Sequence, residues 1–286
     1  MAADVLTTTD VWAERRRRVA QLRARPGYAR QLLDFYGALL DVQETSFRRA
    51  TEASPASSQV ASFAAEVVAP SVIDVSVAVG PERMRSELID RLGVHDARAM
   101  IETWMRSEEQ PLVERFLARA ALGPVLEALP GARVTCRGPR DALHCPDCGG
   151  PPQLSYLGPS PEDLATGRRH LLCARCGGSW GYTRMRCAGC GEETSARLPI
   201  FSEMGTTSGE RGSVVRGLLR PAPPAEAVFP HARIEACETC RRYLLSFDLD
   251  VDRDSVPVVD EIGALPLDLY ARDRGFTKIT TNLMGF

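Results

Sequence analysis

The chain has 286 residues, of which 44% are apolar and 25% charged, and its formal net charge is −2. This composition is ordinary for a soluble globular protein, and the length suits two domains or one domain with an appended module. The nearly balanced charge excludes a global attraction to nucleic acid or to an anionic membrane.

The N-terminal region contains an arginine run that could be mistaken for an export signal. Four arginines follow Glu14, but Gln21, Arg23 and Arg25 come next, where a twin-arginine signal needs an apolar stretch. We find no apolar run that approaches the roughly 18 to 20 residues needed to span a bilayer. The sequence therefore predicts a cytoplasmic protein without membrane insertion.

The first 130 residues contain no cysteine, and their apolar side chains recur with helical spacing. One amphipathic stretch contains Val11 and Leu22, and in the next the apolar residues from Leu32 to Phe47 recur mostly every three or four positions. Further helices are predicted at Val60–Val68, Pro81–Leu92, His95–Trp104 and Pro111–Leu129, whereas Val72–Val79 alternates weakly and is compatible with an extended segment. This region predicts an all-helical bundle of five or six helices, and it shows no phosphate-binding loop or nucleophile elbow.

Eight of the nine cysteines form four Cys-x-x-Cys pairs, and Cys136 is left as a free thiol. The two-residue spacing lets both thiolates of a tight turn point at one ion. The next residue often needs a positive φ, and glycine occupies that place in three pairs while Arg241 occupies it in the fourth. The predicted metal ligands are Cys145, Cys148, Cys173, Cys176, Cys187, Cys190, Cys237 and Cys240. Redox dithiols are the alternative, but a thioredoxin-like dithiol needs a βαβ context that this glycine-rich region lacks.

Two pairs supply the four thiolates of one tetrahedral site, so the chain predicts two ions, each iron or zinc. Sequential pairing joins the first pair with the second and the third with the fourth, and we prefer it because each half then forms its own ribbon. Interleaved pairing, first with third and second with fourth, is the alternative. Four protein ligands leave no open position, which favours a structural site over a catalytic one.

Strand signals surround the cysteine pairs. Arg169–Cys173, Ser179–Met185 and Tyr243–Phe247 are predicted strands, and Met204–Pro224 reads as a loop. From Asp141 to Phe247 there are 12 arginines and 11 acidic residues, a net charge of +1, which is far below that of domains that grip a phosphate backbone. We therefore expect no nucleic acid as a partner.

The composition changes to glycine, proline and arginine near residues 131–144, which marks a linker. The predicted division is a helical domain at 1–134, a linker at 135–144, a first four-cysteine module at 145–186, a second at 187–250, and a C-terminal helix and tail at 251–286. Leu265–Arg274 is the amphipathic helix of that last segment.

The order of these motifs resembles one known family. A helical domain precedes Cys145-Pro-Asp-Cys148-Gly, then Arg169-His-Leu-Leu-Cys173-Ala-Arg-Cys176, Arg184-Met-Arg-Cys187-Ala-Gly-Cys190 and Glu235-Ala-Cys237-Glu-Thr-Cys240, and the chain closes with Val259-Asp-Glu, Leu267-Asp and Gly275-Phe. The chain is similar to the formate dehydrogenase accessory proteins (the FdhE family). The resemblance implies an α+β fold, with an all-helical N-terminal domain followed by two small rubredoxin-like or zinc-ribbon β modules.

The resemblance also implies a function. It implies an assembly chaperone, not an enzyme, that binds the catalytic subunit of formate dehydrogenase in the cytoplasm during maturation before export, and a homodimer is a further possibility. Arginines beside the cysteine pairs are candidate contacts: Arg168, Arg169, Arg184, Arg186, Arg241 and Arg242. The alternatives are a redox-active, rubredoxin-like iron protein and a zinc-ribbon nucleic-acid-binding protein.

Overall fold

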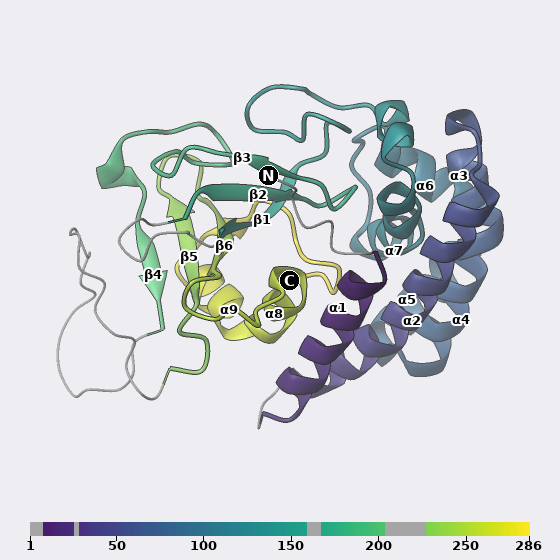
Figure 1. Cartoon of the computed structure of the whole chain (residues 1–286), viewed down its shortest axis with the longest axis horizontal. Coiled ribbons are helices and arrows are strands. Elements are labelled where there is room, and N and C mark those ends of the chain that lie inside the picture. Colours follow the sequence, from purple (N-terminus) through teal and green to yellow (C-terminus); the bar gives the residue numbers. More distant parts are fainter. Residues whose placement is uncertain (1–7, 26–28, 159–166, 204–226) are drawn as a thin grey trace.

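The structure is a computed structural model, and it describes residues 8–25, 29–158, 167–203 and 227–286. It confirms the predicted α+β class, with the N-terminal helices gathered on one side and a mixed sheet on the other (Figure 1). The helices are α1 (Thr8–Arg23), α2 (Arg30–Ala53), α3 (Val60–Phe63), α4 (Ala69–Val79), α5 (Glu82–Leu92), α6 (Ala97–Met105), α7 (Leu112–Ala128), α8 (Pro257–Gly263) and α9 (Leu265–Asp273).

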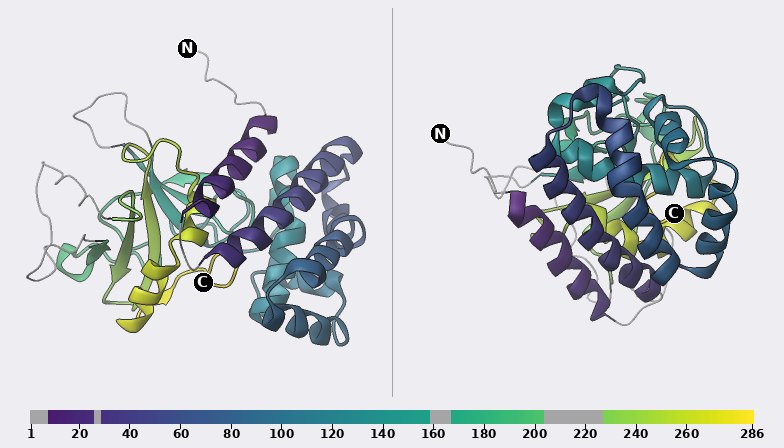
Figure 2. Two further views of the ribbon diagram at one scale, coloured as in Figure 1. Left: turned by 90° about the horizontal axis from the view of Figure 1, so that it is seen from below. Right: turned by 90° about the vertical axis from the view of Figure 1, so that its right-hand side faces the viewer.

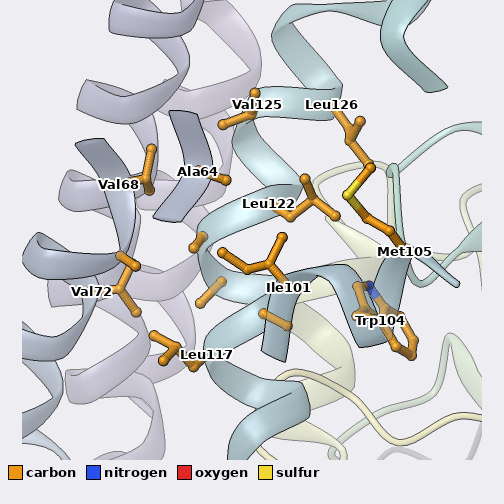
Figure 3. Close-up of a cluster of buried hydrophobic side chains, with 14 of the residues drawn as sticks. Ala64, Val68, Val72, Ile101, Trp104, Met105, Leu117, Leu122, Val125 and Leu126 are labelled. Carbon is orange, nitrogen blue, oxygen red and sulfur yellow. The ribbon is translucent and has the colours of Figure 1, made fainter. Parts of the chain in front are cut away.

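Helix α7 is the centre of the helical part. Leu117, Leu122 and Leu126 are fully buried on it, and they pack in one cluster with Ile101 of α6, Val68 of the π-helical turn Ala64–Val68 and Val72 of α4 (Figure 3). The same apolar cluster contains the cysteines of the first pair and of the second. Burying one leucine side chain contributes about 2 kcal/mol. Since these leucines and the cysteines belong to the same apolar cluster, α7 anchors the first cysteine module to the bundle.

The segment Ser57–Val79 corrects two predictions. It is one helical stretch in which a π-helical turn, Ala64–Val68, joins α3 to α4, so the extended segment expected at Val72–Val79 is wrong. Pro70 lies in the first turn of α4, where proline favours a helix start, and does not bound a strand. The stretch is also long and apolar enough to span a bilayer by length and composition, contrary to our expectation. One third of this apolar window (33%) is buried, and those residues lie in the helical core.

The cysteine pairs lie around one continuous sheet. Its strands are β1 (Pro152–Leu157), β2 (Arg169–Cys173), β3 (Ser179–Gly181), β4 (Ile200–Ser202), β5 (Ala232–Cys237), β6 (Arg242–Asp248) and β7 (Thr277–Lys278), in the order β3-β2-β1-β6-β5-β4 with β7 on β6. All neighbours are antiparallel except β1 with β6 and β6 with β7. The two modules are therefore joined edge to edge through β1 and β6, where our preferred pairing envisaged separate ribbons.

Both modules repeat the same order of elements. Each has a cysteine pair, two antiparallel strands, a second cysteine pair at the end of the second strand, and a third strand. In this order β1, β2 and β3 of the first module correspond to β4, β5 and β6 of the second. Each second cysteine pair therefore lies at the turn that follows a strand, which fixes the direction of its thiols.

Helices α1, α8 and α9 cover the sheet. Trp12 and Leu22 of α1 share an apolar cluster with Ile234 and Phe247 of the sheet and Ile262 of α8. Figure 2 shows α1 between the helical part and the sheet. The Arg18 side chain, on the same helix, bonds Asp260 of α8, so α1 attaches the N-terminal helices to the C-terminal segment. The division at residues 134, 144, 186 and 250 stays a prediction.

Candidate metal centres

The first cluster brings together the sulfurs of Cys145, Cys148, Cys173 and Cys176, all buried and all within 4.8 Å of one another. The Sγ atoms of Cys145 and Cys176 are 3.8 Å apart, and those of Cys148 and Cys173 are 3.4 Å apart. This is the grouping that sequential pairing predicts.

The second cluster brings together Cys187, Cys190, Cys237 and Cys240, also within 4.8 Å. Its Sγ distances are 3.8 Å between Cys187 and Cys240 and 3.7 Å between Cys190 and Cys237. Unlike the first cluster, it is open to solvent, because Cys190 is exposed and Cys240 is partly exposed. The two clusters therefore have the same donors in different surroundings.

These distances fit a tetrahedral ion. Four sulfurs about 2.3 Å from one ion lie roughly 3.8 Å apart, and three of the four sulfur–sulfur distances given above are within about 0.1 Å of that spacing. Zinc and a single iron both accept four thiolates. Each cluster could therefore hold one ion with no position left for a substrate.

The turns that carry the cysteines have the predicted geometry. Gly149, Gly177 and Gly191 have φ values of 68°, 67° and 79°, and Arg241 has a φ of 56°. The fourth turn therefore keeps the shape of the others without glycine. A left-handed conformation costs a non-glycine residue about 1–2 kcal/mol. The Arg241 side chain offsets this by lying 4.1 Å from the Phe276 ring centroid and donating a 2.6 Å hydrogen bond to the Arg274 carbonyl.

Backbone N–H groups point at the sulfurs, as the spacing predicts. Gly150 donates to Cys148 Sγ and Arg175 donates to Cys173 Sγ, both at 3.3 Å. Gly150 also leaves no room for a side chain, since a Cβ there would lie 2.7 Å from Cys173 Sγ. The first cluster is thus shaped by the backbone of its turns.

Buried arginines surround the first cluster, and the sequence did not single them out. Arg175 is 2% exposed, and its Nη1 donates to the Cys148 carbonyl at 2.9 Å while its guanidinium carbon lies 5.2 Å from the Trp104 ring centroid. Arg119 of α7 donates from Nε to the Ala174 carbonyl at 3.2 Å, and burial lowers its pKa to about 10. Burial raises the pKa of the Cys173 thiol, so its thiolate needs nearby positive charge. A divalent ion with four thiolates is still anionic, and these guanidinium groups complement that charge.

Cys136 lies near the first cluster but outside it. Its side chain is 2% exposed in the apolar cluster around α7, and burial raises the pKa of its thiol to about 11. A thiol that stays protonated is a poor ligand and a poor nucleophile. Cys136 is therefore a small apolar core residue, in agreement with the free thiol that we expected.

A third group of possible ligands, His231, Asp252 and Asp260, also lies within 4.8 Å. The Arg18 guanidinium already contacts both carboxylates, at 2.6 Å for Asp252 and 2.9 Å from Nε to Asp260. Burial raises the pKa of Asp260, but the hydrogen bonds from His231 and Arg18 outweigh it and hold the pKa below its ordinary value. Arg18 supplies the positive charge that an ion would supply, so this group is an ion-pair network.

A second buried network surrounds Lys278, the one lysine of the sequence. Its side chain is 2% exposed, and Nζ lies 2.8 Å from Glu261 and 2.9 Å from Asp268. Gln153 links Glu261 to Arg119, which carries the network back to the first cluster. Together, the Arg18 and Lys278 networks attach α8, α9 and the C-terminal strand β7 to the helical part and to the sheet.

Several of the arginines that the sequence nominated as client contacts are engaged within the chain. Arg169 is buried and pairs with Glu235 at 2.6 Å, and Arg184 donates to the Gly167 carbonyl. Arg186 pairs with Glu193 at 3.4 Å. These side chains support the second module and the β2–β3 edge, and the role of the arginines beside the cysteine pairs as client contacts stays a prediction.

Comparisons with known proteins agree with this architecture. Residues 224–284 match the family described as the FdhE C-terminal domain. A protein named FdhE homolog from Aquifex aeolicus is 30% identical over 145 residues, which cover 50% of this chain and 42% of that protein. The FdhE homolog of Pseudomonas aeruginosa is also 30% identical, over 49% of this chain and 38% of its own length. Each alignment thus covers less than half of the relative.

One solved structure extends the likeness to the whole fold. The crystal structure of the FdhE protein from Pseudomonas aeruginosa superposes with a TM-score of 0.62 and 20% sequence identity, covering 97% of this chain and 96% of that one. At that identity the match establishes the fold alone. Together with the sequence matches, it confirms the predicted resemblance to the FdhE family.

Proposed function

We propose that this chain is a non-catalytic accessory protein that binds the catalytic subunit of formate dehydrogenase in the cytoplasm, during maturation and before export. The observation that carries the proposal is the match of residues 224–284 to the FdhE C-terminal domain. That segment contains the last cysteine pair, Cys237 and Cys240, and the Lys278 network.

The metal centres have a structural role in this proposal. The eight paired cysteines hold two ions, iron or zinc, and each ion has a complete set of four protein ligands. Small four-thiolate modules depend on the ion for folding, by about 10–16 kcal/mol in zinc-finger peptides. The ions therefore fix the sheet, and through Arg175 and Arg119 they fix the position of the helices that a client would meet.

Affinity capture from the native host tests the proposal. The tagged chain, purified under anaerobic conditions from cells that express formate dehydrogenase, should retain the catalytic subunit of that enzyme. A variant with Cys237→Ser and Cys240→Ser should lose it, and an exposed control, Arg49→Gln, should keep it. If the wild-type chain retains no subunit from cells in which the subunit is present, the proposal fails.

A redox-active iron protein is the second candidate, and the solvent exposure of the second cluster favours it. Cys190 is exposed, so an iron held there lies close to solvent and to an electron donor or acceptor. Protein purified anaerobically would then be coloured and would bleach on reduction by dithionite. Colourless protein with two zinc ions per chain would exclude this function.

A further inference from the structure

A groove of about 380 Å³ lies between the helical part and the C-terminal tail, and no cysteine lines it. Helices α5 and α7 form one side, and residues 281–286 form the other. Figure 2 shows the C-terminal end of the chain against the helices. The volume of the groove lies within the range of about 300–1,000 Å³ that is typical of ligand sites.

The floor of the groove is apolar. Val113 and Phe116 of α7 are 3% and 5% exposed, and Met84 of α5 and Met284 of the tail are partly buried beside them. Leu112 lies at the first position of α7 and is 50% exposed. Flexible methionines and an exposed leucine suit apolar side chains of varied shape.

The charges around this floor are unbalanced. Arg83, Arg115 and Arg272 line the groove, and Glu87 is the one acidic side chain among the lining residues. Within the described part of the chain, no salt bridge joins any of the three arginines to a carboxylate. Burial lowers the pKa of Arg115, so its positive charge is held in a partly desolvated place.

Arg119 adds to this field from beneath the floor. Its guanidinium bonds the carbonyls of Ala174 and Thr281 and the side-chain Oε1 of Gln153, which are all neutral acceptors. No carboxylate bonds to it among the described residues, but its charge also faces Glu261 and the Cys173 sulfur of the first cluster, so the three rim arginines supply most of the positive charge of the groove. An apolar floor with an excess of positive charge is complementary to a partner that is apolar and anionic.

We propose that this groove is the docking site for a segment of the client protein that carries apolar side chains and carboxylates. The apolar side chains fill the floor, and Arg83, Arg115 and Arg272 pair with the carboxylates at the rim. The proposal rests on the function proposed above, because it names the surface through which this chain holds its client. The groove is an alternative contact surface to the arginines beside the cysteine pairs, several of which are engaged within the chain.

Peptide binding tests the site directly. The probe is a fluorescein-labelled synthetic peptide of leucine, phenylalanine and glutamate, and fluorescence anisotropy of the full chain measures its Kd. Matched peptides replace every glutamate by glutamine or by lysine. The glutamate peptide should bind at least about tenfold more tightly than either, and its binding should weaken as salt rises, because the rim charges are exposed. Equal binding of the three peptides would overturn the proposal.

Two variants locate the binding in the groove. Arg115→Gln should weaken binding of the glutamate peptide about tenfold, as expected for loss of a partly buried ion pair. Leu112→Glu places a carboxylate in the first turn of α7, where it favours the helix, while it repels the peptide. The control Arg49→Gln removes an exposed arginine of α2 that does not line the groove and should change nothing. If both groove variants bind like the wild type, the groove is not the site.

The same variants separate this inference from the proposed function. If the wild type and Leu112→Glu capture the formate dehydrogenase subunit equally, the function stands and the groove is wrong. If the wild type captures none while the glutamate peptide binds at the groove, the function fails and the docking site stands. If the chain is a dimer that Leu112→Glu converts to a monomer, and the glutamate peptide does not bind, the groove holds a second copy and the proposal is overturned.

Discussion

The guanidinium Nη1 of Arg175 donates a 2.9 Å hydrogen bond to the carbonyl oxygen of Cys148, so two turns of the first cluster are linked by a buried cation. Arg175 also donates from Nη2 to Ser107 at 2.6 Å and lies over Trp104 of α6. The first cysteine cluster is therefore coupled to the helical part by one side chain that lies between Cys173 and Cys176 in the sequence.

Replacing Arg175 should weaken the first centre. Arg175→Met keeps much of the apolar stem but leaves the Cys148 carbonyl and Ser107 without their donor, at a cost of about 1–3 kcal/mol in the free energy of unfolding. One of the two ions should then be released faster to a chelator. The measurement is the time course of release, with Arg49→Gln as the exposed control, and an unchanged time course would show that Arg175 does not support the centre.

Double cysteine variants test which pairs share an ion. With sequential pairing, Cys145→Ser with Cys176→Ser should leave one ion per chain, because both ligands belong to the first cluster. Cys145→Ser with Cys187→Ser should leave none, because it damages both clusters. Interleaved pairing gives the opposite result for the second variant, which would keep one ion. Metal content per chain, measured on purified protein, distinguishes the two.

Gly150 should not accept even a methyl group. In Gly150→Ala the added Cβ would lie 2.7 Å from Cys173 Sγ and 3.1 Å from Cys148 Sγ, so a ligand has to move. We expect loss of the ion from the first cluster and retention of the other. Gly123→Ala is the matched control, since a Cβ at Gly123 meets no atom within 4 Å. If Gly150→Ala keeps two ions, the first cluster is less tightly packed than the structure indicates.

Stability should depend on pH through Asp260. Hydrogen bonds from His231 and Arg18 outweigh burial and lower its pKa below the ordinary 3.8. The stabilisation is therefore present above about pH 3.8 and is lost as the pH falls through the lower pKa of the folded state. Asp260→Asn should lower the free energy of unfolding near pH 7, by less than the roughly 3–5 kcal/mol of a buried charge left without any partner, because Arg18 keeps its 2.6 Å contact with Asp252.

Urea unfolding across a pH series measures this effect. The difference between the wild type and Asp260→Asn should shrink as the pH falls below about 3.8, where Asp260 becomes protonated first in the unfolded chain and, at its lower pKa, in the folded state. The exposed Asp254→Asn control should behave as the wild type at each pH. A difference that stays constant with pH would mean that the Asp260 charge does not stabilise the fold.

Local patterns made much of the fold predictable. The helical spacing from Leu32 to Phe47 lies in α2, and the strand signal at Arg169–Cys173 is β2. The cysteine spacing predicted the four turns, because a Cys-x-x-Cys turn is built by adjacent residues. It left two ways of grouping the turns, and the structure has the sequential grouping that we preferred. Even Arg241, which departs from the glycine rule, adopts the positive φ that its position requires.

What the sequence did not predict depends on contacts between distant residues. The parallel pairing of β1 with β6 joins residues about ninety positions apart, and no local pattern indicates it. Arg175 and Arg119 look like ordinary surface arginines until the fold buries them. The predicted loop Met204–Pro224 lies outside the described residues. The segment Val72–Val79 was misjudged because β-branched residues favour strands, whereas packing against α2 and α7 places this segment in a helix.

The most direct test of the central claim, that two four-thiolate metal centres organise this chain, is the metal content of the anaerobically purified protein together with its visible spectrum. The structure predicts two ions per chain. Disruption of either cluster should release one of them. Two iron ions with thiolate-to-iron absorption, or two zinc ions without colour, both agree with that prediction and identify the metal. A chain that folds with no bound ion, or with its paired cysteines in disulfides, would contradict it.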